Sequence, residues 1–171
     1  MVAVVGVLGT LLSALLTQRA ADRSRRREQE RVEEGVERSR QAQELRSCYV
    51  ALNTAARQYL AVLTDQLHAM GRGEDRGAVR QRLNDARDQY REVYAEAQLQ
   101  VPERVLELAE ELSHDLGAVY GMARRLDDGV PQGDDSLPAM RACIEALWAR
   151  LRRMRGDMRE ELGAFRSNPG R

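Results

Sequence analysis

The sequence predicts an all-α protein. An N-terminal transmembrane helix is expected to continue into a charged helical stalk and then into an up-and-down four-helix bundle. Four observations support this prediction. Residues 1–18 carry no charge, and further along the chain apolar residues recur every three or four positions, as on one face of a helix. A single Phe and a single Ile leave few strand-forming segments, and 171 residues leave room for one domain.

Residues 1–18 are interpreted as a membrane anchor. As a helix they would span roughly 27 Å, slightly less than the hydrocarbon core of a bilayer, and the long side chains of Arg19 and Arg23 can extend the span. A secretory signal peptide has basic residues before its apolar stretch, whereas here the arginines follow it. The positive-inside rule then places the N-terminus outside and the body in the cytoplasm. A buried soluble helix is the alternative interpretation.

Two features of the first 27 residues predict contacts in the membrane. Small residues at spacings of three and four predict a self-association face, through which the chain would form a homo-oligomer, although small residues are common in membrane helices generally. Five arginines accompanied by one acid predict contact with anionic lipid headgroups. The self-association face comprises Ala3, Gly6, Thr10, Ser13 and Thr17, and the headgroup contacts are Arg19, Arg23, Arg25, Arg26 and Arg27.

Residues 19–44 form the predicted stalk, which is rich in arginine and glutamate and contains no proline. Pairs such as Glu34 and Arg38, one helical turn apart, favour an exposed helix. Gly35 is its expected weak point, because glycine costs about 1 kcal/mol relative to alanine in a helix interior.

Four amphipathic segments within residues 45–166 predict the bundle. Their similar lengths and short loops are what an up-and-down arrangement requires. Pro102 suits the first turn of the third helix, and either Asp135 or Ser136 can cap the fourth. Residues 167–171 are expected to form a disordered tail.

The charge is balanced overall and uneven along the chain. The 27 basic residues, all arginine, match 27 acids, which argues against nucleic acid as a partner. Residues 101–137 carry a net charge of −6 and residues 138–171 one of +4. Attraction between two adjacent antiparallel helices explains this pattern, and a bipolar surface that docks a charged protein is the alternative. Trp148 is a candidate partner contact or a partly buried boundary residue.

No motif predicts catalysis, so the chain is expected not to be an enzyme and to need no cofactor. Asp65 with His68, and Glu111 with His114, have the spacing of the carboxylate–histidine ligands in di-iron bundles. Helical geometry places these side chains away from the apolar stripes of their helices. They are therefore interpreted as surface residues, and no metal ligand is predicted.

The tyrosines and cysteines are interpreted as structural. Tyr49, Tyr59 and Tyr90 are expected to fill the edges of the core, with hydroxyls that reach water. Cys48 and Cys143 fall at opposite ends of the predicted bundle, too far apart for a disulfide. Two reduced thiols also suit a cytoplasmic body.

A resemblance to known proteins is carried mainly by residues 1–67. The opening VAVVGVLGTLLSALLTQRA, the arginine-rich stretch after it, and CYVALNTAARQYLAVLTDQLHAM resemble short single-span membrane proteins of streptomycete-type actinobacteria. Some proteins with a similar anchor carry the plasmid-transfer name KilB. The replacement of every lysine by arginine fits such a source. The resemblance implies a membrane location and a helical body, and it implies no particular activity.

These observations predict a membrane-anchored helical-bundle interaction or scaffolding protein without catalytic activity. Membrane lipid, a further copy of the chain and an unidentified protein are its expected partners. A regulator of plasmid transfer or of another membrane assembly is the alternative, and it rests on the resemblance. A metal-dependent enzyme is the third hypothesis, suggested by the two carboxylate–histidine pairs.

Overall fold

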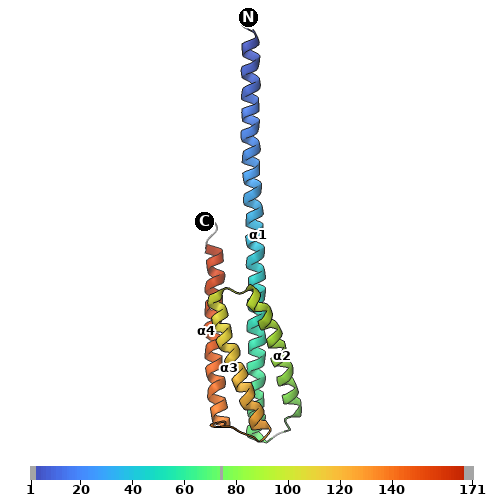
Figure 1. Cartoon of the computed structure of the whole chain (residues 1–171), viewed down its shortest axis with the longest axis vertical. Coiled ribbons are helices and arrows are strands. Elements are labelled where there is room, and N and C mark those ends of the chain that lie inside the picture. Colours follow the sequence, from blue (N-terminus) through green and yellow to red (C-terminus); the bar gives the residue numbers. More distant parts are fainter. Residues whose placement is uncertain (1–2, 74, 168–171) are drawn as a thin grey trace. The chain divides into compact units, whose positions relative to one another are not determined.

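The computed structural model describes residues 3–73 and 75–167, and side chains within residues 28–29, 31–73 and 75–163. The described residues are almost entirely helical and contain no strand, which confirms the predicted all-α class. The chain divides into two compact units, residues 1–43 and 44–171. The helices are α1 (Ala3–Arg72), α2 (Gly77–Gln100), α3 (Glu103–Asp127) and α4 (Leu137–Ser167), as labelled in Figure 1.

The first unit consists of the N-terminal part of α1. Its backbone is helical from Ala3 onward, and Gly35 does not interrupt it. Arg38 Nη2 lies 3.1 Å from Glu34 Oε2, which is the predicted pair one turn apart. Among the described residues, no helix combines the length and the apolar character needed to cross a bilayer. The side chains of the predicted anchor, self-association face and headgroup contacts, all within residues 1–27, lie outside the described side chains.

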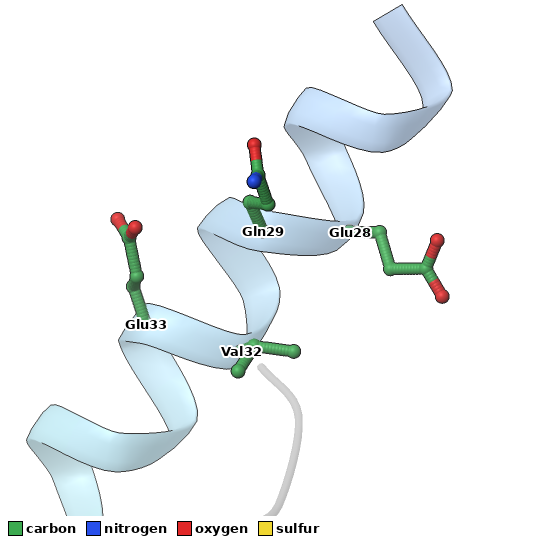
Figure 2. Close-up of a pocket in the computed structure, with 4 residues that line it drawn as sticks. All are labelled: Glu28, Gln29, Val32 and Glu33. Atoms are coloured by element: carbon green, nitrogen blue, oxygen red, sulfur yellow. The ribbon is translucent and has the colours of Figure 1, made fainter. Parts of the chain in front are cut away.

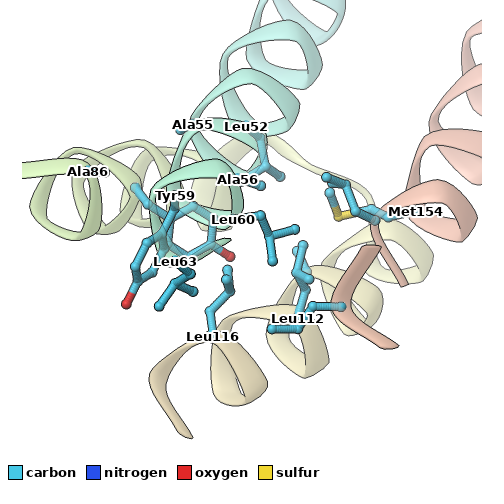
Figure 3. Close-up of a cluster of buried hydrophobic side chains, with 14 of the residues drawn as sticks. Leu52, Ala55, Ala56, Tyr59, Leu60, Leu63, Ala86, Leu112, Leu116 and Met154 are labelled. Atoms are coloured by element: carbon cyan, nitrogen blue, oxygen red, sulfur yellow. The ribbon is translucent and has the colours of Figure 1, made fainter. Parts of the chain in front are cut away.

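The second unit is a four-helix bundle. It contains α1 from residue 44 onward together with α2, α3 and α4, and helices consecutive in sequence run antiparallel (Figure 1). Buried residues from all four helices form one hydrophobic core. Figure 3 shows Leu60 and Leu63 of α1 facing Leu112 and Leu116 of α3, with Met154 of α4 beside them. This arrangement agrees with the predicted up-and-down bundle.

Local chemistry sets the ends of the bundle helices. Pro102 precedes α3, and its carbonyl accepts hydrogen bonds from the amides of the first turn. Ser136 Oγ accepts a hydrogen bond from the Ala139 amide at 3.2 Å, so Ser136 caps α4 and Asp135 does not. After α3 the chain turns at Gly129, whose φ is +71°, and the Val130 amide donates to the Arg125 carbonyl at 2.9 Å. This is the Schellman arrangement that ends many helices.

Candidate interaction surface

The two carboxylate–histidine pairs lie on the surface of the bundle. Asp65 lies 3.4 Å from Arg82 of α2, and Glu111 lies 2.6 Å from Arg150 of α4. His68 and His114 are exposed. In the part of the chain that the structure describes, no group of three or more His, Cys, Asp or Glu residues is placed to hold a metal ion.

The hydroxyls of the three inward tyrosines do not reach water, so this prediction was wrong. Tyr49, Tyr59 and Tyr90 are 3%, 2% and 2% exposed, and their hydroxyl oxygens have no hydrogen-bond partner among the described residues. The rings of Tyr59 and Tyr90 lie 5.8 Å apart, and Tyr94 stacks on Tyr90 at 6.0 Å. These aromatic neighbours close the edge of the core that was expected to stay open. Burial accordingly raises the pKa of Tyr49 to about 12.

Other polar side chains near these tyrosines form contacts with one another between α2 and α3. The Tyr120 hydroxyl donates a hydrogen bond to Asn84 Oδ1 at 3.0 Å. The Arg87 guanidinium lies 4.6 Å from the centre of the Tyr120 ring, a favourable cation–π distance. These contacts join two helices, and they leave no set of polar groups directed at a common ligand.

Asp127 is a buried charge that was not predicted from the sequence. Its side chain, at the end of α3, is 1% exposed and lies between two arginines from the start of α2. Arg80 Nε donates to Oδ2 at 2.7 Å, and Arg76 Nη1 forms an ion pair with Oδ1 at 3.0 Å. The signal was present in the sequence, because Asp127 falls four residues after Ala123 and so continues the apolar stripe of α3.

Opposite charges on α3 and α4 meet, as one of the two interpretations of the uneven charge predicted. Arg150 of α4 lies 2.6 Å from Glu111 and 2.9 Å from Asp115, both on α3. Arg104 of α3 lies 3.2 Å from Asp157 of α4. Trp148 is half-buried against the core, which is the boundary position predicted as its alternative role.

Several arginines of the bundle form no ion pair among the described residues. Five of them lie on α1 and α4, and we call these five the basic face; Arg91 of α2 and Arg141 and Arg153 of α4 are the others. All are exposed except Arg155, which is half-buried and whose Nε has no hydrogen-bond partner. None of them forms an ion pair within the described residues. The basic face comprises Arg46, Arg57, Arg152, Arg155 and Arg159.

The helical register brings these arginines together along the α1–α4 contact. α1 ends at Arg72 and α4 begins at Leu137, at the same end of the bundle (Figure 1). Because the two helices run antiparallel, fifteen residues back in α1 match fifteen residues onward in α4, which places Arg57 near Arg152. The five arginines then fall within about 18 Å along the bundle axis.

An acidic counterpart lies on the outer surface of α3. Glu103, Glu107 and Glu110 are spaced by four and three residues and therefore share one side of the helix. All three are exposed. Among the described residues they form no ion pair. We call this set the acidic ridge.

Two hollows of the described surface are each lined, among the described residues, by a single helix. Figure 2 shows the first, beside α1, where the carboxylates of Glu28 and Glu33 point away from each other, so its polar groups do not converge. The second is an open depression on the first turns of α4, lined by Leu137, Pro138, Arg141, Ala142 and Glu145. Neither hollow has the enclosed apolar walls of a typical ligand site.

No protein-family model, curated protein or solved structure matches the chain. The basic face and the acidic ridge are its strongest candidates for an interaction surface, because each gathers charges of one sign that form no ion pair among the described residues.

Proposed function

We propose that the chain is a membrane-anchored interaction or scaffolding protein, whose bundle presents charged surfaces to a protein partner. The observation that carries this proposal is the basic face. Elsewhere in the bundle, arginines such as Arg80, Arg104 and Arg150 lie against carboxylates of neighbouring helices. Five arginines close together that form no ion pair among the described residues repel one another and lower stability. Binding to an acidic partner explains why the chain contains a cluster that lowers its stability.

The membrane part of the proposal rests on the sequence. Residues 1–18 are uncharged and nearly long enough, as a helix, to cross a bilayer. The five arginines within residues 19–27 would lie where anionic headgroups attract them. An anchor of this kind fixes the bundle near a membrane and confines its encounters to that surface.

A non-catalytic role agrees with how the described polar groups are used. Buried Asp127 is neutralised by two arginines, and the histidines are exposed on separate helices. Catalysis in a bundle core needs several polar groups that converge on one point. The described contacts connect helices to one another instead.

Membrane fractionation combined with crosslinking tests the proposal. The full-length chain is expected in the membrane fraction and resistant to an alkaline carbonate wash, whereas a chain lacking residues 1–18 should be released. Crosslinked complexes should disappear in the double variant Arg152→Glu/Arg159→Glu and persist in the control Arg141→Glu, which reverses one charge about three turns away on the same helix. Recovery of the full-length chain in the soluble fraction would refute the anchor. Complexes indifferent to the double variant would refute the role of the basic face.

A further inference from the structure

We infer that the basic face binds the acidic ridge of a second copy of this chain, so that bundles associate side by side and in parallel. The inference deepens the proposed function, and its membrane setting rests on that proposal.

The basic face and the acidic ridge lie on different sides of the bundle, so these two surfaces of one copy cannot bind each other. Ion pairs connect α1 with α2 through Asp65 and Arg82, and α3 with α4 through Glu111 and Arg150. Arg80 and Asp127 connect α2 with α3 in the same way. The helices therefore follow one another around the core, and α4 meets α1 on the side away from the contact between α2 and α3. The basic face lies on the side where α4 meets α1, and the acidic ridge lies on the outer surface of α3.

The two surfaces also lie at the same height along the bundle. Asp65 of α1 pairs with Arg82 of α2, and Arg80 of α2 pairs with Asp127 of α3. Since the helices are antiparallel, residue 107 of α3 matches residue 100 of α2 and hence residue 47 of α1. Glu107 is thus level with the basic face, which runs from residue 46 to residue 57 of α1.

Because the basic face and the acidic ridge lie at the same height along the bundle, two copies that bind through them must point in the same direction. Both surfaces lie in the half of the bundle that contains the start of its α1 segment. When two copies point the same way, the basic face of one lies level with the acidic ridge of the next. When one copy is inverted, the basic face of the other lies against the half of the bundle that lacks the acidic ridge. Parallel copies are what chains anchored in one membrane with one orientation require. A contact between two different surfaces of identical chains propagates into a row or closes into a ring.

Exposed apolar side chains add to the complementarity. Val50, on the outer surface of α1 between Arg46 and Arg57, is 60% exposed. Leu99, near the end of α2 and at almost the same height, is 88% exposed. A contact that buries apolar side chains within a rim of opposite charges has the composition of a typical protein–protein interface.

Paired charge reversals test the inference on the full-length chain in non-ionic detergent. One variant reverses part of the basic face (Arg152→Glu/Arg159→Glu), the other reverses part of the acidic ridge (Glu107→Arg/Glu110→Arg), and Arg141→Glu is the matched control. Sedimentation velocity measures the mass of each protein, and of an equimolar mixture of the two double variants, from low to high salt. Circular dichroism verifies that every variant stays helical.

Wild type and Arg141→Glu should form complexes that dissociate as salt is raised. Each double variant alone should associate roughly tenfold more weakly or worse, because like charges then face each other. The mixture should regain the wild-type mass, since each variant restores the opposite charge for the other. This recovery also shows that both variants fold.

Two results would overturn the inference. The first is self-association of the double variants as strong as that of wild type, as expected if copies meet through residues 1–18 alone. The second is wild-type protein that stays monomeric in detergent but floats with vesicles containing phosphatidylglycerol and loses this property in Arg152→Glu/Arg159→Glu, which would make anionic lipid the occupant. Neither result alters the membrane fractionation, so failure of this inference is distinguishable from failure of the proposed function.

Discussion

Replacing Tyr59 by Phe should stabilise the bundle. The Tyr59 side chain lies in the core at 2% exposure, and its hydroxyl is buried with no hydrogen-bond partner among the described residues. Burying a hydroxyl without a partner costs about 1–3 kcal/mol. Phe keeps the ring, and with it the packing against Tyr90 at 5.8 Å, while it removes this cost. We therefore expect the free energy of unfolding to rise by about 1 kcal/mol, the lower end of that range.

Tyr120→Phe is the matched control, because it removes a tyrosine hydroxyl that does have a partner. That hydroxyl donates to Asn84 Oδ1 at 3.0 Å, and the loss of such a bond typically costs about 0.5–1.5 kcal/mol. Urea unfolding followed by circular dichroism should therefore move the two midpoints in opposite directions. If Tyr59→Phe lowers the midpoint as much as Tyr120→Phe does, then the Tyr59 hydroxyl has a partner such as buried water, and the reasoning fails.

Three further predictions concern the bundle. Asp127→Ala should lower stability by about 2 kcal/mol, because it leaves two half-exposed arginines side by side without their carboxylate, and an unchanged melting temperature would contradict this. The raised pKa of Tyr49 means that the folded state holds the phenol proton more tightly than the unfolded state, whose pKa is about 10. Stability from this group should therefore be intact below about pH 10 and decline as the pH rises toward about 12, as alkaline melting curves would show. Cys143, which is half-buried, should react with iodoacetamide before Cys48, which is buried and has a raised pKa; mass spectrometry of partly modified protein would reveal the order.

Sequence reasoning was most successful where a single helix contains the information. Apolar spacing located all four helices of the bundle, because one buried stripe is a property of one helix and repeats along it. Helix ends were readable to within a residue: Pro102 comes directly before α3 and not in its first turn, and Ser136, one of the two predicted candidates, caps α4. The free state of Cys48 and Cys143 agrees with the prediction that they fall too far apart to pair.

Features that depend on a neighbouring helix were not readable from the sequence. The Tyr59 ring lies 5.8 Å from the Tyr90 ring of α2, and the apolar spacing along α1 alone does not reveal that α2 supplies this neighbour. The same holds for the arginines. Arg150 has an acid beside it and Arg152 has none, although both lie on α4. The difference arises from the direction in which each faces and from the residues that α3 or α1 places at that height.

Paired and unpaired charges should respond differently to salt, and this separates folding from association. Asp127 is buried and in direct contact with its arginines, so mobile ions screen these pairs only weakly. The basic face is exposed, and ions can screen its attraction to an approaching acidic surface, over a distance of about 8 Å at physiological ionic strength. Salt can therefore weaken contacts between copies while the pairs within each bundle remain. A bundle with this division of charges can assemble and disperse without unfolding, which suits a protein whose proposed role is reversible assembly at a membrane.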